Sequence, residues 1–483
     1  MPLGGGEGMA MGKYRYLLHN MGLLTLSSFA TKLLSFFLVP LYTSVLSTAD
    51  YGTYDLINTT VSLLIPVLTL DIQEAVLRFA LDDGDKERVL LVGLKYFILS
   101  MLVVVVFTGC NLAIGIFEVF AQYPIEFVLM YAVMSLSGIL SYYARGVEHV
   151  SDLSVASVLS SFVSIILNIY FLVFLGMGLL GYFYATIIGS LVMVVYLFFS
   201  LRLYRKHIRK SDNGSLERDM TKYSIPMIAN AVSWWVNNAS DRYFVTWICG
   251  VAANGIYAVS YKIPSIISVL QSIFGQAWTI SAVKDFDKND ADGFYIKIYN
   301  LYNALLVIAC SMLIFLVKPL ALILFAKDFY IAWMYSPFLM IGTVFSGMSA
   351  FVGGLFSALK KSKSFAQTSV VSAVTNVVGN IALVPLVGPF GASVTTAASY
   401  LIMLMMRIYM IRKDVNLAVD FRRDLVSYAL LIFQGLALCF DGIESAFSWY
   451  QIVFVIAQIV LFRAEVSSSI NKVVQALRQT PAK

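Results

Sequence analysis

Long apolar segments that recur along nearly the whole chain constrain its fold more than any other feature. The chain has 483 residues, of which 59% are hydrophobic and 13% charged, whereas soluble domains carry about 25% charged residues. A helix needs about 20 apolar residues to cross a hydrocarbon core of about 30 Å. Segments of that length follow one another from Met21 to Phe462. The sequence therefore predicts a polytopic membrane protein with no room for a large soluble domain.

The length of these segments predicts helices, because barrel strands would be about ten residues long with alternating polarity. The fold class is therefore an all-α polytopic membrane protein with about fourteen transmembrane helices. The expected spans are 21–45, 53–77, 89–113, 123–144, 153–175, 180–201, 223–249, 254–281, 295–317, 331–358, 365–387, 390–411, 424–440 and 447–463.

The distribution of basic residues predicts the orientation. An even number of spans places both termini on one side of the membrane. If that side is the cytoplasm, all but five of the 34 lysines and arginines lie in cytoplasmic regions or at the adjoining helix ends. The exceptions are Lys32, Arg242, Lys262, Lys318 and Lys327. This asymmetry follows the positive-inside rule, and it explains the net charge of +6 without a nucleic-acid partner. Basic clusters beside a membrane set topology and contact anionic membrane lipids.

Two echoes within the sequence indicate an internal repeat. The segment ADYGTY ends at Tyr54 and AANGIY ends at Tyr257, so that Gly-x-Tyr recurs 203 residues later. A second echo pairs Asn168, Gly181, Thr186 and Leu191 with Asn380, Gly391, Thr396 and Leu401. Both halves would begin in the cytoplasm, which predicts two six-helix lobes in a parallel pseudo-repeat around a central cavity, plus two C-terminal helices. The substrate site of transporters built in this way lies between the halves.

These patterns give the expected domain limits. The parts are a cytoplasmic N-terminal segment (1–20), an N-lobe with spans 1–6 (21–203), a basic cytoplasmic linker (204–222), a C-lobe with spans 7–12 (223–411), spans 13 and 14 (412–463) and a cytoplasmic tail (464–483).

Polar residues inside the spans define a candidate binding site. A charge at membrane depth costs about 2.5–3.5 kcal/mol on insertion scales, so it usually faces a cavity or a partner. Helical spacing places polar residues on one face in spans 1, 2, 7 and 8, which we expect to line a hydrated cavity. Its cations would be Lys32, Arg242 and Lys262. Its polar lining would be Thr25, Ser28, Ser35, Asn58, Ser62, Asn230, Ser233, Asn237, Tyr257, Tyr261 and Ser265.

Such a cavity suits an anion, above all a phosphate, for which arginine is a forked donor and lysine a point charge. Two simpler interpretations remain open. Lys32 could form an internal salt bridge, and the hydroxyls could serve as contacts between helices, which are common in membrane bundles.

Four acids in these spans are candidate ion or proton sites, or else structural groups: Asp55, Asp71, Glu74 and Asp241. Glu74 and Arg78 have the spacing of a helical ion pair. Pro66 predicts a kink in span 2. Asp241 and Arg242 point about 100° apart on a helix, so we expect each to contact another helix. Whether Asp241 pairs with a cation or binds an ion stays open.

The motifs of several enzyme classes are missing from the sequence. It has no nucleotide-binding loop of the Walker type, and no His, Cys or carboxylate cluster suited to hydrolysis. The four cysteines are far apart and lie in or beside apolar segments, unlike a metal site or disulfide framework. We therefore expect no catalytic residue, metal site or cofactor, and a protein that is not an enzyme.

Several segments carry a resemblance to a known family. They are Lys32 to Thr43, ADYGTY ending at Tyr54, SDRYF from Ser240, GIYAVSYKIP from Gly255, and NIALVPLVGPFGA from Asn380. Together they resemble polysaccharide biosynthesis flippases, the O-antigen (Wzx-type) transporters of the multidrug/oligosaccharidyl-lipid/polysaccharide (MOP) exporter superfamily. One departure is SVTT from Ser393, where the family tends to have Ala-x-Ala-Thr.

The resemblance implies a V-shaped bundle of two lobes whose cavity opens alternately to each side of a bacterial or archaeal cell (inner) membrane. It implies a flippase that moves polyprenyl-pyrophosphate-linked oligosaccharide from the inner to the outer leaflet, with H⁺ or Na⁺ as a candidate coupling ion. The alternatives are a flippase for the peptidoglycan precursor lipid II and a MATE-like multidrug or cation antiporter. A membrane-embedded polysaccharide polymerase is disfavoured because the longest outer loop, near Lys318 to Tyr330, is short and poor in acid-base residues.

Overall fold

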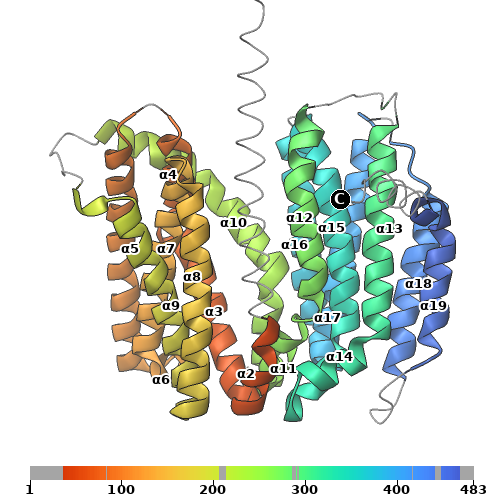
Figure 1. Ribbon diagram of the computed structural model, residues 1–483, viewed down its shortest axis with the longest axis horizontal. Helices are drawn as coiled ribbons and strands as arrows, with labels where there is room; N and C mark the ends of the chain where they lie inside the picture. Colours follow the sequence, from red (N-terminus) through yellow and green to blue (C-terminus); the bar gives the residue numbers. More distant parts are fainter. Residues whose placement is uncertain are drawn as a thin grey trace, which may run out of the picture. The chain divides into compact units, whose positions relative to one another are not determined.

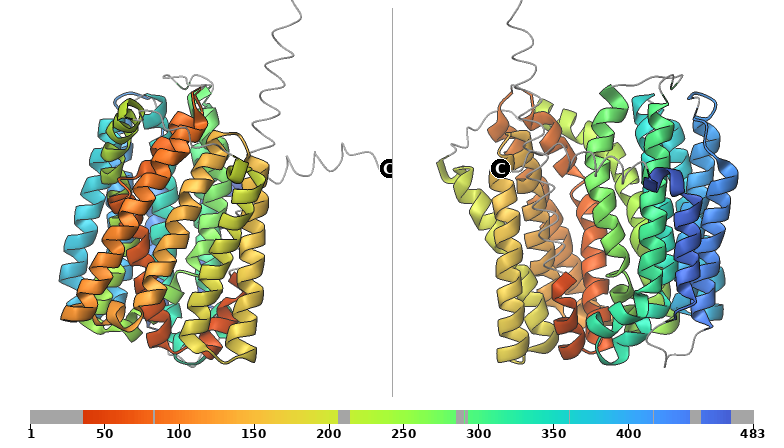
Figure 2. Two further views of the ribbon diagram at one scale, coloured as in Figure 1. Left: turned by 90° about the vertical axis from the view of Figure 1, so that its left-hand side faces the viewer. Right: turned by 45° about the vertical axis from the view of Figure 1, so that its right-hand side comes forward.

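The chain is helical throughout the residues that the computed structural model describes. These are 36–82, 84–205, 214–284, 290, 293–359, 361–415, 417–440 and 448–467, and they contain no strand. Figures 1 and 2 show long helices that run roughly side by side within each half of the chain. The described residues therefore confirm the predicted all-α fold.

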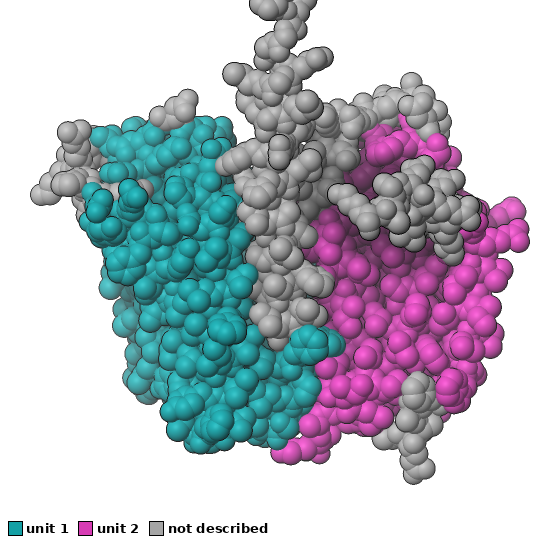
Figure 3. Space-filling view, in the orientation of Figure 1, with its two compact units in different colours: residues 1–239 teal, residues 240–483 magenta. Residues whose placement is uncertain are grey.

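Two compact units divide the chain, Met1–Ala239 (unit 1) and Ser240–Lys483 (unit 2) (Figure 3). The division falls inside the long helix α10 (Gly214–Cys249). Unit 1 also contains α2 (Val39–Val45), α3 (Thr48–Leu68), α4 (Ile72–Ala80), α5 (Lys86–Ile114), α6 (Glu118–Gln122), α7 (Pro124–Gly146), α8 (Val150–Ile169), the π-helix η1 (Tyr170–Phe174), α9 (Gly178–Ser200) and the short η2 (Leu203–Arg205).

Unit 2 continues from the end of α10. Its helices are α11 (Val251–Ser260), α12 (Pro264–Lys284), α13 (Phe294–Phe315), α14 (Val317–Leu324), the 3₁₀-helix η3 (Lys327–Met334), α15 (Ser336–Ala358), α16 (Ser362–Val387), α17 (Pro389–Ile411), α18 (Phe421–Cys439) and α19 (Gln451–Leu461). The predicted domain limits, including the linker at 204–222, stay predictions.

Eight helices within the described residues are long and apolar enough to cross a membrane, and two bent pairs raise the number to ten. The chain is thus a multi-pass membrane protein. The predicted count of fourteen is not decided, because most of the first predicted span lies outside the described residues.

The second predicted span is broken rather than continuous. Helices α3 and α4 meet at an angle of 60°, and the break begins at Thr69, three residues after Pro66. Leu70 and Asp71 adopt positive φ angles of 55° and 49°, a conformation that costs energy for residues other than glycine. A proline removes one helical hydrogen bond and crowds the preceding turn, so Pro66 weakens the last turns of α3, while the break itself lies at the positive-φ residues Leu70 and Asp71.

The eighth predicted span is broken in a similar way. Val251–Ser260 and Pro264–Gly275 meet at 49°, and Tyr261, Lys262 and Ile263 form the turn between them. Pro264 is the first residue of α12, a position where its missing N–H costs nothing. The break places Tyr261 and Lys262 at a bend inside an otherwise apolar span.

Helix α15 is the central helix of unit 2, since 78% of the residues in its most apolar stretch are buried. Glycines allow its neighbours to approach closely. A Cβ at Gly342 would lie 3.3 Å from the backbone of Ala397 in α17, and one at Gly354 would lie 2.6 Å from the indole of Trp278 in α12. The Trp278 ring also stacks on Phe351 at 4.0 Å. These contacts hold α12 and α17 against α15.

The internal repeat extends to equivalent hydrogen bonds. In unit 1 the Ser160 hydroxyl donates to the Gly189 carbonyl at 2.7 Å, which joins α8 to α9. In unit 2 the Ser372 hydroxyl donates to the Ser399 carbonyl at 3.0 Å, which joins α16 to α17. Ser372 follows Ser160 by 212 residues and Ser399 follows Gly189 by 210, the spacings of the Asn168/Asn380 and Thr186/Thr396 echoes. The two helix pairs are therefore matching parts of the internal repeat.

The last two helices, α18 and α19, pack against α13 (Figure 2), and reciprocal serine–glutamine pairs link these helices. The Ser311 hydroxyl donates to Gln434 Oε1 at 2.7 Å, and Gln434 Nε2 donates back to the Ser311 carbonyl at 3.0 Å. Ser427 and Gln458 repeat this arrangement between α18 and α19, with both distances at 2.9 Å. All four side chains are buried. Two matching pairs thus link α13, α18 and α19 in series.

Candidate functional site

Asp241 is the most deeply buried acid of the predicted site, with an exposed fraction of 1%. Its Oδ2 accepts hydrogen bonds from the Tyr257 hydroxyl at 2.5 Å and the Tyr261 hydroxyl at 2.6 Å. Tyr257 lies in α11, and Tyr261 is the residue directly after the end of that helix. Because the two tyrosines are four residues apart, both rings lie on one side of the helix. The predicted contact of Asp241 with another helix is therefore observed.

A second layer of polar side chains joins Asp241 to α16 and α17. The Thr396 hydroxyl lies 3.5 Å from Asp241 Oδ2 and accepts from Asn376 Nδ2 at 3.4 Å. Asn376 Oδ1 accepts from Asn380 Nδ2 at 2.9 Å and from the Ser240 hydroxyl at 3.3 Å. These side chains are buried. The cluster is thus a connected network of carboxylate, amide and hydroxyl groups inside unit 2.

Two oxygen atoms in the same stretch of α16 and α17 have no hydrogen-bond partner among the described residues. They are Asn380 Oδ1 and Thr395 Oγ1, and both are buried. In the part of the chain that the structure describes, Asp241 forms no ion pair with a lysine or arginine. Buried polar groups are nearly always satisfied. The cluster therefore contains oxygen atoms that are available as ligands for a cation or as hydrogen-bond acceptors for a water molecule.

Arg242 points toward the same tyrosine from another direction. Its guanidinium lies over the ring of Tyr261, 4.9 Å from the centroid, a distance typical of a cation–π contact. Its side chain is half-buried. Tyr261 thus contacts both charges, accepting Arg242 on its ring face and donating its hydroxyl to Asp241.

Lys262 follows Tyr261 at the bend between α11 and α12. It is half-buried, and its carbonyl accepts a hydrogen bond from the Ser265 hydroxyl at 2.5 Å. The predicted cation Lys262 therefore lies at the bend, and in sequence it directly follows Tyr261, whose ring Arg242 contacts. Of the predicted cations and acids, Arg242 and Asp241 contact Tyr261, and Lys262 follows it in sequence.

The remaining predicted residues of α10 follow one face of this helix. Asn230 is exposed, Ser233 is half-buried and Asn237 is buried. The Ser233 hydroxyl donates to the Ala229 carbonyl at 2.7 Å, and Asn237 Nδ2 donates to the Ser233 carbonyl at 2.9 Å. The predicted polar face is therefore present, and its side chains become more buried toward Asp241.

Within unit 1, the predicted residues Asp55, Asn58 and Ser62 lie along α3, and Ser62 is exposed. The Ser62 hydroxyl donates to the Thr59 carbonyl at 2.7 Å. The same carbonyl accepts from the indole N–H of Trp235 at 3.0 Å, which fixes the first part of α10 on α3. The hydrogen bond of the Ser62 side chain is thus made to the backbone of its own helix.

The acids at the α3–α4 break differ from the predicted arrangement. Asp71 is buried and accepts from Gln73 Nε2 at 3.3 Å, while Glu74 accepts from the Tyr142 hydroxyl at 3.3 Å. The predicted Glu74–Arg78 pair is wrong, because Arg78 instead bonds to Asp82 at 2.6 Å. Glu74 faces α7, whereas Asp82 lies beyond the end of α4, where the arginine reaches it in solvent.

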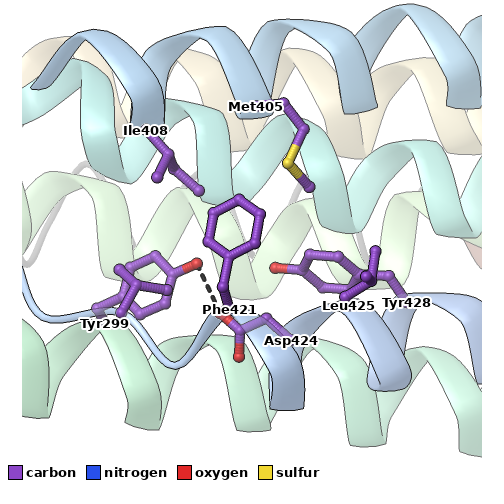
Figure 4. A pocket seen from close by; sticks show the side chains of 8 residues that line it. Tyr299, Met405, Ile408, Phe421, Asp424, Leu425 and Tyr428 are labelled. Carbon is purple, nitrogen blue, oxygen red and sulfur yellow. Dashed lines mark hydrogen bonds between the residues drawn. The ribbon is translucent and has the colours of Figure 1, made fainter. Parts of the chain in front are cut away.

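The candidates Thr25, Ser28, Lys32 and Ser35 lie outside the described residues. A separate small pocket in unit 2 is lined by Tyr299, Met405, Ile408, Val419, Phe421, Asp424, Leu425 and Tyr428 (Figure 4). Its volume of about 10 Å³ holds about one water molecule. The Tyr299 hydroxyl donates to Asp424 at 2.9 Å, so this pocket belongs to the contact between α13 and α18.

Comparison of the sequence with known families now gives the context of this site. The family profile described as polysaccharide biosynthesis protein matches residues 17–280, more than half of the chain. The chain belongs to the polysaccharide biosynthesis protein family. The match includes α10, α11 and the bend with Lys262. No curated protein sequence matches the chain.

Solved structures show which fold this polysaccharide biosynthesis protein adopts. It is similar to the lipid II flippase MurJ in an inward closed conformation, with a TM-score of 0.64 and 14% identity over 94% of this chain and 99% of that one. It is also similar to a multidrug resistance MATE family transporter of the MOP superfamily in an inward-facing conformation, with a TM-score of 0.63 and 13% identity over 79% and 94%.

A third similar structure is a MOP superfamily transporter from Pyrococcus furiosus, described as having a binding pocket of reverse polarity. Its TM-score is 0.51, at 15% identity over 82% of this chain and 94% of that one. At such identities the likeness shows the fold alone. The polysaccharide biosynthesis protein therefore has the fold of MOP superfamily flippases and transporters.

Several residues of the Asp241 cluster were missed from the sequence. Asn376, Asn380 and Thr396 lie more than 130 residues beyond Asp241, and no local pattern links them to it. One signal was present, since Asn380 and Thr396 both belong to the repeat, and Asn376 lies one helical turn before Asn380. Polar residues at a four-residue spacing in an apolar helix mark a buried polar face.

Proposed function

We propose that this protein is a flippase that moves polyprenyl-pyrophosphate-linked oligosaccharide from the inner to the outer leaflet for cell-surface polysaccharide biosynthesis. The observation that carries the proposal is the match of residues 17–280 to the polysaccharide biosynthesis family. The MOP fold supports it, since flippases and exporters share this fold. The distribution of basic residues supports a cell (inner) membrane location with cytoplasmic termini.

In this proposal Arg242 and Lys262 contact the pyrophosphate, together with Lys32. Arg242 lies over the ring of Tyr261, and a planar guanidinium is a forked donor suited to phosphate oxygens. Hydroxyls and amides of the predicted lining would replace the hydration of the sugars, while the lipid tail stays in the bilayer. Alternating access of the cavity would then move the head group across without any chemical change of the substrate.

We further propose Asp241 as the site of a coupling ion, H⁺ or Na⁺. Its carboxylate is buried and accepts from two tyrosines, and the same polar network continues through Thr396 and Asn376 to Asn380. Ionisable residues inside membrane proteins are expensive and commonly belong to ion pathways or proton relays. The hydrogen bonds from Tyr257 and Tyr261 would weaken when H⁺ or Na⁺ neutralises Asp241, which links ion binding to the ring that Arg242 contacts.

A reconstituted flipping assay tests the main proposal. Liposomes containing wild type, R242A or K262A would receive lipid-linked oligosaccharide, and head groups reaching the other leaflet would be measured. We expect flipping by wild type and a loss of at least about tenfold in R242A, since contacts to charged groups contribute about 1.5–3 kcal/mol. The matched control is R78A, which removes an exposed arginine paired with Asp82 and should flip at the wild-type rate.

Two further substrates separate the alternatives. Lipid II in the same liposomes tests the function named for the structurally similar MurJ, and a cationic dye tests that of the MATE transporter. Transport of lipid II in preference to the oligosaccharide would replace the proposed substrate. Efflux of the dye without flipping would replace the flippase with an antiporter. Folded R242A and K262A that both flip at the normal rate would remove the cationic site.

A further inference from the structure

Arg407 is a buried arginine whose partners are all neutral. It lies in the last turns of α17 with an exposed fraction of 3%. Its Nη1 donates to the Ser349 carbonyl at 2.7 Å, its Nη2 to the Ser369 hydroxyl at 2.9 Å and its Nε to the Thr368 hydroxyl at 3.1 Å. The guanidinium lies 4.3 Å from the centroid of Phe365. Side chains and backbone of α15 and α16 therefore fix its position.

The charge of Arg407 has no acidic partner within the described part of the chain. Among the residues that the structure describes, no aspartate or glutamate forms an ion pair with Arg407. The hydroxyl of the neighbouring Ser349 is also buried without a partner. Burying a charge without an opposite charge is costly, and a guanidinium stays protonated under all ordinary conditions. Arg407 therefore places a permanent positive potential inside unit 2.

A line of buried polar residues between α16 and α17 connects Arg407 with Asp241. Thr368, Ser372 and Asn376 of α16 face Thr396, Ser399 and Arg407 of α17, and we call this line of buried residues the polar seam. Their spacings place them on one side of each helix. Thr396 lies at Asp241, and Arg407 lies eleven residues further along α17, about 16 Å at the helical rise. The polar seam thus runs from the acid to the buried cation.

Tyr400 lies between these ends. It is buried and close enough to both Asp241 and Arg407 to interact with each electrostatically. The Ser399 hydroxyl donates to the Thr396 carbonyl at 2.9 Å, and the Ser372 hydroxyl to the Ser399 carbonyl at 3.0 Å. Hydroxyl and carbonyl oxygens are the groups that coordinate small cations and relay protons in membrane proteins. A cation leaving Asp241 along the polar seam would meet such groups until it reached Arg407.

We propose that Arg407 is a fixed-charge barrier that stops the cation bound at Asp241 from leaking along the polar seam to the end of α17. The inference rests on the proposed ion site at Asp241. A charged arginine that lines a pathway excludes cations by electrostatic repulsion, as in other selective membrane proteins. With this exit closed, the ion can leave only on the side through which Asp241 becomes accessible during transport, so transport stays coupled.

The repeat provides an internal comparison for this proposal. At the spacings of Thr186/Thr396 and Asn168/Asn380, Arg407 corresponds to Leu197 in unit 1, and Thr368 and Phe365 correspond to Ala156 and Leu153. Those three residues lie in one apolar cluster of unit 1. The charge is therefore not required by the helix packing that both units share. It occurs in unit 2, which contains Asp241.

A leak assay tests the barrier without any lipid-linked substrate. Wild type, R407Q and R407K would be reconstituted into liposomes, and proton and sodium entry would be followed under an imposed gradient with a pH-sensitive dye and radioactive sodium. We expect R407Q to leak at least about tenfold faster than wild type, because a unit charge repels a passing cation strongly at low dielectric. R407K keeps the charge and should stay tight.

Three further variants make the test specific. R412Q removes an exposed arginine one turn further along the same chain segment and should not leak. The double variant R407Q/D241N should lose the leak, because the path would begin at Asp241. S369D places an acid where the Ser369 hydroxyl accepts from Arg407 Nη2. The arginine is kept, but the new carboxylate offsets its positive charge, so this variant should leak. S369D carries the test if R407Q does not fold.

Several outcomes would overturn the proposal. They are R407Q or S369D that is folded and as tight as wild type, R407K that leaks as fast as R407Q, and a leak that persists in R407Q/D241N. Because no lipid-linked substrate is present, these results do not depend on flipping. A protein that fails to flip oligosaccharide but shows the expected leak pattern would lose the proposed substrate and keep the barrier.

Discussion

The two halves of the repeat use matching tyrosines in different ways. In unit 1 the Tyr54 hydroxyl bonds to the Thr186 hydroxyl at 3.1 Å, and its ring packs on Tyr182 at 4.0 Å. In unit 2 the matching residues are Tyr257 and Thr396, and both reach Asp241 instead of each other. The same positions thus form a neutral contact in one unit and surround a carboxylate in the other.

This difference shows how a duplicated scaffold can divide its tasks. The helix pairs α8/α9 and α16/α17 keep the same serine-to-backbone bond, so their packing was retained. The charged groups differ, because Asp241 and Arg407 lie in unit 2 and the position matching Arg407 in unit 1 is the apolar Leu197. Shared packing and unshared charges therefore point to a structural role for the repeat and a functional role for its departures.

The largest expected effect comes from placing the unit 2 charge into unit 1. L197R would bury a guanidinium in an apolar cluster in which Ala156 stands at the position of Thr368, so that one of the two hydroxyl acceptors of Arg407 has no counterpart there. We expect a loss of more than about 4 kcal/mol of unfolding free energy, since unpaired buried charges are among the most destabilising changes. Thermal unfolding in detergent would measure it, with L197M as control. A stable L197R would show that the two sites are interchangeable.

Removing the tyrosine hydroxyls should affect the two units unequally. Y257F removes a donor to the Asp241 carboxylate, for which about 2 kcal/mol is typical, whereas Y54F removes a bond between two hydroxyls, for which about 1 kcal/mol is typical. Denaturant unfolding of both variants would give the two free energies. Equal losses would mean that Asp241 is neutral in the folded protein or well hydrated, and the contrast between the units would disappear.

The variants Y54F and Y257F also distinguish an effect on stability from an effect on transport. Y54F should lower stability without changing the dependence of flipping on an imposed ion gradient. Y257F should also shift the ion concentration that gives half-maximal flipping, because its hydroxyl bonds to the proposed ion ligand. A shift of equal size in Y54F would contradict the assignment of the ion site to unit 2.

The smallest expected effect concerns the bond that both units share. S160A and S372A each remove one hydroxyl that bonds across a helix pair. Interhelical hydrogen bonds in membrane proteins contribute about 0.6 kcal/mol, so each variant should lose about that amount in unfolding free energy. The two losses should agree. A much larger loss in S372A would mean that the Ser372 hydroxyl has a role in the polar seam beyond packing.

The sequence alone was sufficient for the fold class and the repeat, because apolar length and periodicity are local properties. It also gave the bend after Pro66 and the separate directions of Asp241 and Arg242, which follow from helical geometry. It assigned Arg78 to Glu74 wrongly, since spacing alone could not show that Glu74 faces Tyr142 on α7. Partners that come from a different helix depend on packing, which sequence spacing does not contain.

Arg407 shows the same limit more clearly. Its place near the end of an apolar segment suggested one more cytoplasmic arginine of the positive-inside pattern. The structure buries it, because α15 and α16 supply a carbonyl and two hydroxyls where a helix end beside the cytoplasm would supply water. The one available signal was the repeat, in which an arginine replaces a leucine at a matching position.

The serine–glutamine pairs of the last helices bear on how the chain enters the membrane. Helix α18 carries Gln434 and an acid near its start, Asp424, and it is not among the eight apolar helices. Polar residues in a segment make its insertion on its own unfavourable. Its partners on α13 are synthesised more than 100 residues earlier, so they are already in place when α18 emerges. The C-terminal helices would thus be drawn into the bilayer by a partner helix rather than by their own hydrophobicity.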